Sequence, residues 1–254
     1  MPKLDPIRDN YYRQVELADK SSDWLFYLGA TLSLLSLFID QTTSPRLSNA
    51  ALTLFCLDVV ALLCLSTASR LYLTPRAEDR RRQDFLSNAF GVSLTHVRTE
   101  GYYNNDQTLP IRRLAAQTLE NSLFSKTIAL RMARRERTKI AIYATIWILV
   151  AINRQVSVGV ILAISQVIFS EQILAKFLRL EWLRNRFEHV YENTYRLFQT
   201  TPRSGDFNAC ALELLTMYET TKATASITLD SRDFSKINEE TSAEWESIKT
   251  TLHI

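Results

Sequence analysis

Residues 47–69 read LSNAALTLFCLDVVALLCLSTAS and form the longest apolar run of the chain. The run holds 23 residues between Arg46 and Arg70, and Asp58 is its single charged residue. At a rise of about 1.5 Å per residue, about 20 helical residues cross a hydrocarbon core of about 30 Å. The sequence therefore predicts a transmembrane helix here.

Three shorter apolar runs occupy residues 24–39, 140–153 and 155–170. Each is short for a membrane span, and a run of about 10–14 apolar residues is also typical of a buried helix in a soluble protein. Polar connectors at 40–49 and 153–157 join the four runs in pairs. This pairing predicts two transmembrane hairpins.

The composition favours helices throughout. The chain has 254 residues with only 5 Gly and 6 Pro, too few for a protein built on tight β-turns. Its three cysteines, Cys56, Cys64 and Cys210, form neither a disulfide framework nor a CxxC metal site. We therefore expect an all-α chain whose soluble parts lie in a reducing compartment.

The distribution of positive charge predicts the orientation in the membrane. The two connectors carry one arginine each, Arg46 and Arg154, whereas residues 70–139 carry fourteen Lys and Arg residues. Lys and Arg close to membrane spans stay on the cytoplasmic side. The linker and both termini are therefore expected in the cytoplasm.

The predicted fold is an all-α integral membrane protein with two transmembrane helical hairpins, hence four spans, and a helical cytoplasmic domain made from the linker and the C-terminal tail. Its expected segments are an N-terminal cytoplasmic segment (1–22), hairpin 1 (23–70), a linker that acts as sensor (71–138), hairpin 2 (139–173) and a C-terminal helical region (174–254). Within them, helices are expected at 78–90 (ended by Gly91), 111–139 running on into the third apolar run, 156–199, 207–221 and 242–252, with an irregular piece at 225–233.

The sequence offers no catalytic chemistry. His96, His189 and His253 lie far apart, and no P-loop, dinucleotide-binding or nucleophile-elbow motif occurs. We therefore expect a protein that is not an enzyme, with no catalytic residue, metal site or cofactor.

Two features point to binding or gating instead. Arg80, Arg81 and Arg82 could grip phosphates, with Tyr102 and Tyr103 stacking on bases and Asn104 and Asn105 reading base edges. The other interpretation of the arginines is a topology signal that attracts anionic lipid. Asp58, costly at mid-membrane, could line a pore or lock an oligomer, or it could be protonated or paired within the helix packing.

The linker resembles a known family. Residues 82–91 (RQDFLSNAFG), 101–105 (GYYNN) and 120–125 (ENSLFS) look like the linker of bacterial SMODS-associated four-transmembrane effectors from CBASS-type antiphage systems. The resemblance covers about residues 20–180, including the two-plus-two arrangement of spans. It places Asn88, Glu120 and Asn121 among the family-like positions, together with Tyr102, Tyr103, Asn104 and Asn105.

This resemblance implies an effector in the bacterial inner membrane that senses a cyclic nucleotide made by a partner nucleotidyltransferase. Binding of this messenger, or of a partner protein, would make the membrane part oligomerise and breach the membrane. The implied partners are the lipid bilayer, a cyclic oligonucleotide and further copies of the chain, with no binding of DNA or RNA. A constitutive membrane scaffold or channel subunit without a small ligand is the alternative, and a soluble helical protein is the third.

Overall fold

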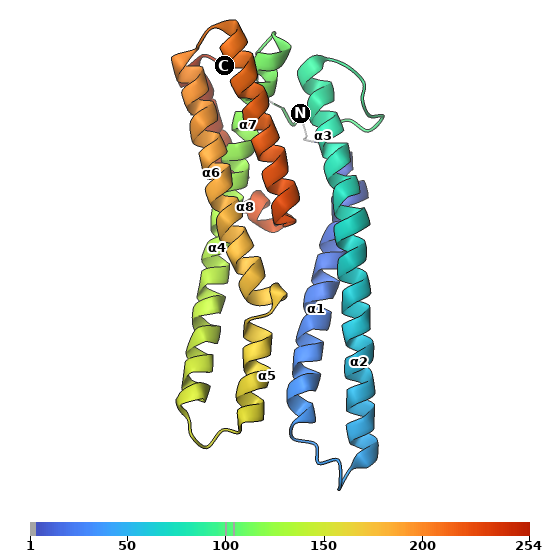
Figure 1. Cartoon of the computed structure of the whole chain (residues 1–254). Coiled ribbons are helices and arrows are strands. Elements are labelled where there is room, and N and C mark those ends of the chain that lie inside the picture. Colours follow the sequence, from blue (N-terminus) through green and yellow to red (C-terminus); the bar gives the residue numbers. More distant parts are fainter. Residues whose placement is uncertain (1–3, 100, 104) are drawn as a thin grey trace. The chain divides into compact units, whose positions relative to one another are not determined.

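The computed structural model describes residues 4–99, 101–103 and 105–254, and its elements are helices (Figure 1). This confirms the all-α prediction. The α-helices are α1 (Arg13–Ser36), α2 (Pro45–Ala68), α3 (Thr74–Phe90), α4 (Pro110–Ile152), α5 (Val158–Ile168), α6 (Lys176–Thr200), α7 (Ser204–Ala225) and α8 (Ser231–Leu252). Three single-turn π-helices are η1 (Arg8–Tyr12), η2 (Ser69–Leu73) and η3 (Glu171–Ala175).

The chain forms two compact units that interleave along the sequence. The core unit consists of residues 4–13, 74–134 and 179–254. The apolar unit consists of residues 14–73 and 135–178. The polypeptide therefore passes from one unit to the other several times, and α4 contributes residues to both.

The core unit is built around α4, α6, α7 and α8 (Figure 1). The stripe Leu180, Leu183, Phe187 and Val190 on α6 is buried, as the helical spacing of these residues predicts. Together with residues of α4 and α7 it forms one apolar cluster. A second cluster joins all four helices and contains Ala115, Ala116, Leu119, Leu123, Leu197, Phe198, Phe207, Ala211, Leu214, Trp245, Ile248 and Ile254.

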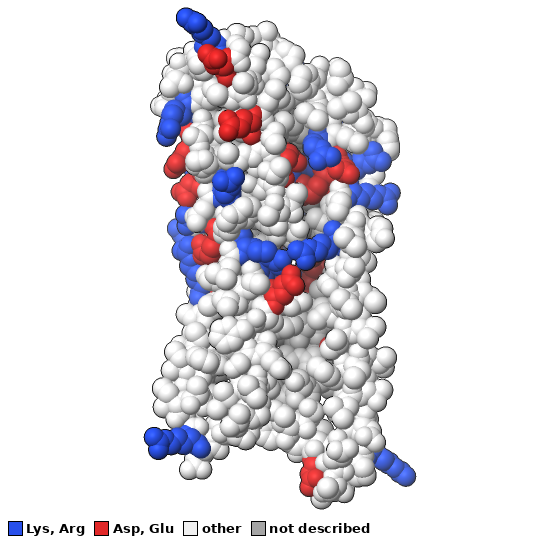
Figure 2. All heavy atoms as spheres, viewed as in Figure 1, with Lys and Arg blue, Asp and Glu red and all other residues white. Residues whose placement is uncertain are grey.

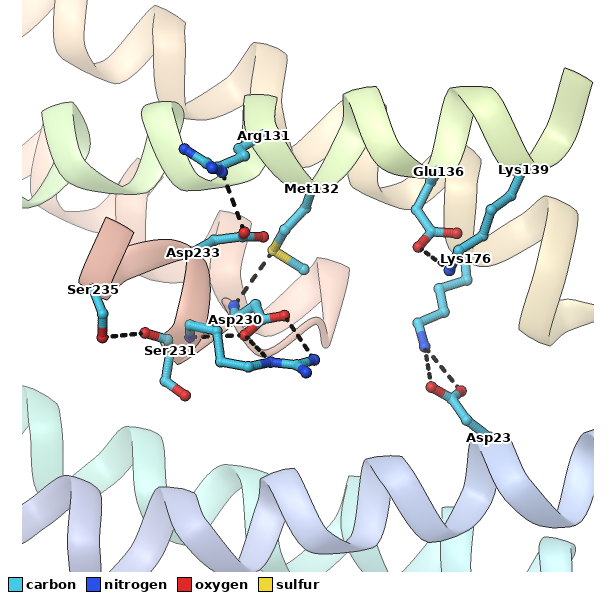
Figure 3. Close-up of polar contacts among 11 residues, drawn as sticks. Asp23, Arg131, Met132, Glu136, Lys139, Lys176, Asp230, Ser231, Asp233 and Ser235 are labelled. Atoms are coloured by element: carbon cyan, nitrogen blue, oxygen red, sulfur yellow. Dashed lines mark hydrogen bonds and ion pairs between the residues drawn. The ribbon is translucent and has the colours of Figure 1, made fainter. Parts of the chain in front are cut away.

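The C-terminal helix begins earlier than the sequence predicted. Asp230 caps α8, because its side chain accepts from the backbone N–H of Arg232 at 2.9 Å. Two contacts hold this start on α4 (Figure 3): Arg131 pairs with Asp233 at 3.3 Å, and the backbone N–H of Asp230 donates to the Met132 sulfur. The prediction that this helix starts near residue 242 was wrong. It was based on apolar periodicity, whereas the observed start is fixed by the Asp230 cap and by contacts with α4.

The apolar unit consists of two helical hairpins. Residues 37–44 connect α1 to α2, and residues 153–157 connect α4 to α5. The two hairpins touch, since the hydroxyls of Tyr27 and Tyr143 lie 3.3 Å apart and Lys176 pairs with Asp23 at 3.1 Å. The predicted pairing of the four apolar runs is therefore present.

The predicted single helix over 156–199 is interrupted. α5 ends at Ile168, and Ser170 takes an extended conformation before η3 and α6 continue the chain. Serine readily leaves helical geometry, and Glu171 supplies an acidic residue in the next first turn, where the helix dipole favours it. The break contains no Pro or Gly, the residues that usually mark a helix break in a sequence.

Two helical segments are long and apolar enough to span a membrane, 45–90 and 158–200. The prediction of four such helices is therefore confirmed only in part. Residues 24–39 and 140–153 are helical over most of their length but too short to span a membrane by themselves. In the first segment, α1 already ends at Ser36. In the second, charged residues occupy the helix up to Lys139. Only 11% of the apolar window in each spanning segment is buried within the chain, unlike the core helix of a soluble protein.

Large apolar side chains cover the outside of the apolar unit. Trp24 on α1, Leu63 on α2, Leu149 on α4 and Val158 on α5 are each exposed by more than half. On the face seen in Figure 2, the helices of this unit are almost free of charge between their ends. A continuous apolar surface of this kind marks contact with lipid or with another protein.

One close contact joins α1 to α2. Asp58 is buried on α2, and a side chain at Gly29 of α1 would collide with its carboxylate. The carboxylate atom Oδ1 has no hydrogen-bond partner among the described residues. Glycine at position 29 therefore lets the two helices approach, as small residues do in membrane helix packing.

We expect Gly29→Ala to destabilise the apolar unit by about 1–3 kcal/mol, because the added methyl overpacks the helix contact. Gly159→Ala is the matched control, since its methyl would meet its nearest neighbour at an ordinary 3.9 Å. Thermal unfolding in detergent measures both. The double variant Gly29→Ala/Asp58→Ala should recover stability, and purely additive losses would contradict this contact.

Candidate functional site: an arginine and tyrosine cluster in the core unit

The loop after α3 is folded back onto that helix. Gly91 ends α3 with a positive φ of 69°, the left-handed conformation expected of a C-cap. Asp84 then accepts from the backbone N–H and the hydroxyl of Thr99, at 3.1 and 2.6 Å. These bonds bring residues 101–103 to the side of α3, where the Tyr103 ring meets Phe85 edge-on at 5.8 Å.

The three consecutive arginines of α3 point in different directions. Arg80 donates to Gln83 at 2.9 Å, and Arg82 pairs with Asp79 at 2.6 Å; both partners lie one turn away on the same helix. Arg81 instead turns toward the interior of the core unit. The structure therefore brings only Arg81 to the predicted tyrosines.

Arg81 lies in a group that we name the arginine cage, formed by Arg81, Asp5, Tyr12 and Tyr102. Its Nη2 donates to Asp5 Oδ2 at 2.7 Å, and the side chains of the pair are only 16% and 17% exposed. Its guanidinium carbon lies 5.5 Å from the Tyr12 ring centre and 4.9 Å from that of Tyr102. Buried Nη1 donates to no described residue, so the guanidinium keeps capacity for another acceptor.

An aromatic row extends the cage toward the core. Tyr102 meets Tyr103 edge-on at 5.4 Å, and Tyr103 packs with Phe85, Ala89 and Leu114. The buried Tyr103 hydroxyl has no hydrogen-bond partner in the described part of the chain. Tyr103 therefore serves mainly as packing, whereas Tyr102 contacts the charged group.

The predicted asparagines lie apart from the cage contacts. Asn88 accepts from Gln117 through its side chain and from Arg113 through its backbone oxygen, the latter at 3.2 Å. Asn105 accepts from the backbone N–H of Gln107 at 3.3 Å and so stabilises its own turn. Asn104 lies outside the described residues. These bonds hold Asn88 against α4 and Asn105 within its own turn, not at the cage.

A second ionic group stands beside Tyr12. Lys222 of α7 pairs with Glu78 of α3 and, at 3.4 Å, with Glu219. The charge of Glu78 also acts on Tyr12 and, in addition to burial, helps to raise the pKa of its hydroxyl. The pair of Lys222 with Glu78 ties α3 to α7, and the two side chains are mostly shielded from water.

The electrostatics keep both groups ionised and the tyrosines neutral. Burial alone lowers the pKa of Lys222, but Glu78 and Glu219 outweigh it and hold that pKa well above its usual value. Burial likewise opposes the charge of Arg81, yet its neighbours Tyr102 and Asp5 raise the pKa further. Burial raises the pKa of Tyr12 and Tyr102, so both keep their protons at neutral pH.

Sequence reasoning missed Asp5, Tyr12, Glu78 and Lys222. The pair Tyr11–Tyr12 beside acidic residues was a visible signal, but its partners lie far away in sequence. Arg81 and Asp5, for example, are 76 residues apart. In the described part of the chain, no group of three His, Cys, Asp or Glu side chains could hold a metal ion.

Comparison with known proteins adds no relative. No family model, no curated protein and no solved structure matches the chain.

We expect Lys222→Met to destabilise the core unit by about 2–3 kcal/mol, because two shielded carboxylates lose their cation. Lys236→Met, at an exposed position of α8, is the control. The raised pKa of Lys222 means that its contribution is fully present below the unfolded-state pKa of about 10.4 and is lost only as pH rises through the folded-state pKa.

Denaturant unfolding in detergent, followed by circular dichroism, should therefore show a constant gap between wild type and Lys222→Met from about pH 7 to about pH 9. Equal stability of the two proteins would show that the ion pairs with Glu78 and Glu219 contribute nothing net.

Proposed function

We propose that the chain is a membrane effector of bacterial antiphage defence, activated from the cytoplasm by a cyclic nucleotide or a partner protein. Activation would make copies of the apolar unit oligomerise and permeabilise the inner membrane. The proposal rests on the family resemblance of the linker and on the arginine cage. The cage is the single observation that carries it, because it places a guanidinium and an aromatic face together.

The membrane part is proposed to have four spans. The two segments that are long and apolar enough are each paired with a shorter apolar helix in a hairpin. The shorter helices carry exposed Trp24 and Leu149, which water would solvate poorly. The proposed orientation puts both connectors outside and the core unit, with both termini, in the cytoplasm.

The cage suits a ligand that carries phosphate and a base. A guanidinium binds phosphate oxygens through charge-assisted hydrogen bonds, and Nη1 of Arg81 is open for one. The Tyr102 ring beside it supplies a stacking surface of the kind that bases use. In this proposal Arg80, Arg82, Asn88 and Asn105 act at most around the rim, because their bonds lie elsewhere.

Asp58 is proposed to couple helix packing to assembly. A buried carboxylate in an apolar unit must find a partner, water or a proton, and each choice depends on how the helices pack. The oligomer distribution of an Asp58→Asn variant that still inserts tests this role; an unchanged distribution would leave Asp58 a tolerated polar residue.

A constitutive scaffold or channel subunit is the second candidate. It is favoured by the fact that Asp5 already pairs with Arg81, so the charge of the arginine is balanced without an added anion. Under this alternative the cage is a purely structural contact. Ligand binding separates the two candidates.

Calorimetry with a panel of cyclic di- and trinucleotides on detergent-solubilised protein is the test. Arg81→Gln should weaken binding at least about tenfold and more at low salt, whereas Tyr102→Ala should cost about 1–3 kcal/mol with little salt dependence. Arg82→Gln, whose partner Asp79 lies on the exposed helix surface, should bind like wild type.

Binding that survives both cage substitutions would move the site elsewhere in the core unit. No binding of any nucleotide by folded protein would favour partner gating or the scaffold.

Topology is tested by labelling intact cells with a membrane-impermeant maleimide, in a variant whose natural cysteines are replaced by serine. Ser44→Cys, in the first connector, should be labelled from outside. Thr108→Cys, in the linker, should be labelled only after the cells are opened. The reverse pattern would invert the proposed orientation.

A further inference from the structure

The N-terminal segment of residues 4–12 is held on α3 by contacts that are mostly charged or aromatic. Asp5 receives both the Arg81 guanidinium at 2.7 Å and the backbone N–H of Arg8 at 3.0 Å. Tyr11 lies under Arg76, with 5.4 Å between ring centre and guanidinium carbon. Ile7 is fully buried, so the segment is docked and not merely close.

Asp5 presents to Arg81 the chemistry that a phosphate would present. A carboxylate and a phosphodiester both offer anionic oxygens to a guanidinium fork. Asp5 is the carboxylate that the structure pairs with Arg81, whereas the neighbouring Glu78 and Glu219 pair with Lys222. An anion that engages both guanidinium nitrogens, the unpartnered Nη1 and the Nη2 held by Asp5, therefore competes with Asp5.

The docked segment is covalently continuous with the first apolar helix. η1 ends at Tyr12 and α1 begins at Arg13, with no Gly, Pro or loop between them. Residues from 14 onward belong to the apolar unit. A displacement of residues 4–12 from α3 would therefore be transmitted to α1 through continuous helical backbone.

We propose that residues 4–12 form an intramolecular latch, in which Asp5 occupies Arg81 as an internal ligand until an anionic, phosphate-bearing ligand displaces it. Release of the latch then frees the beginning of α1. This inference rests on the proposed function, because it names how the same arginine site is regulated. It also gives the resting protein a reason to bury an arginine beside two tyrosines.

The latch is measured by the thiol-labelling rate of Ile7→Cys in the full-length protein, with Cys56, Cys64 and Cys210 replaced by serine. While the segment is docked, the thiol at position 7 should be labelled slowly. The thiol of an Asp9→Cys variant, at an exposed position, should be labelled faster. Adding Asp5→Asn should speed labelling of position 7 about tenfold, because the amide keeps the Arg8 bond but loses the charge that holds Arg81. Asp79→Asn, which removes the exposed partner of Arg82, is the matched control and should change nothing.

Inorganic pyrophosphate is the anion probe, compared with sodium chloride at equal ionic strength. It should speed labelling of position 7 in the parent protein and have no further effect when Arg81→Gln is present. Trypsin cleavage after Arg8 in the natural sequence gives a second readout that does not depend on replacing Ile7.

Equal rates with and without Asp5→Asn, in both readouts, would overturn the latch. Faster rates with Asp5→Asn but no response to pyrophosphate would overturn the displacement of Asp5 by an anion. The Asp5→Asn comparison contains no nucleotide, so its failure is distinct from a failure of the calorimetric test of the proposed function.

Discussion

The outward apolar surface of four helices is left uncovered by the described residues of the chain, and this constraint governs the rest of the molecule. Leaving a Leu or Phe side chain in water forfeits about 1.5–3 kcal/mol relative to burial. In the apolar unit such side chains stand outward on α1, α2, α4 and α5, and only 11% of the two longest apolar windows is buried. Hydrocarbon around these helices would supply the missing burial and would also explain why so few ionic contacts hold them together.

Polar contacts have a different task in the core unit. Helices α4, α6, α7 and α8 share a continuous apolar core, but α3 adds only Phe85, Ala89 and a few neighbours to a small separate cluster. Polar contacts add to its attachment: Glu78 with Lys222 of α7, Asn88 with Gln117 of α4, and Arg81 with Asp5. Contacts of this kind fix geometry and can be exchanged for a ligand, which an apolar contact cannot.

The features of the fold that could be predicted from the sequence are those set by local patterns of apolar spacing and helix capping. The spacing of Leu180, Leu183 and Phe187 predicted the buried face of α6, and Gly91 predicted the end of α3. The paired apolar runs with short polar connectors predicted the hairpins. Each of these signals is contained within a few turns of helix, where period and capping chemistry decide the outcome.

The arginine cage could not be predicted from local sequence, because its contacts join residues far apart in the chain. Consecutive residues of a helix point about 100° apart, so Arg80, Arg81 and Arg82 could not all face one ligand, and which one turned inward depended on Asp5, far away in sequence. The early start of α8 at Asp230 likewise involves partners on α4, Arg131 and Met132. Long-range ionic pairing is the physical reason that the arginine cage was seen only in three dimensions.

We propose that the apolar unit lies in a bilayer while the core unit lies in water, and spin-label accessibility in liposomes tests this placement. Nitroxides at Leu63 on α2 and Leu149 on α4 would be compared with one at Leu212 on α7, all exposed on the chain itself. We expect frequent collisions with oxygen and rare collisions with a water-soluble nickel chelate at positions 63 and 149, and the opposite at 212. Nickel collisions at 63 and 149 as frequent as at 212 would contradict the account.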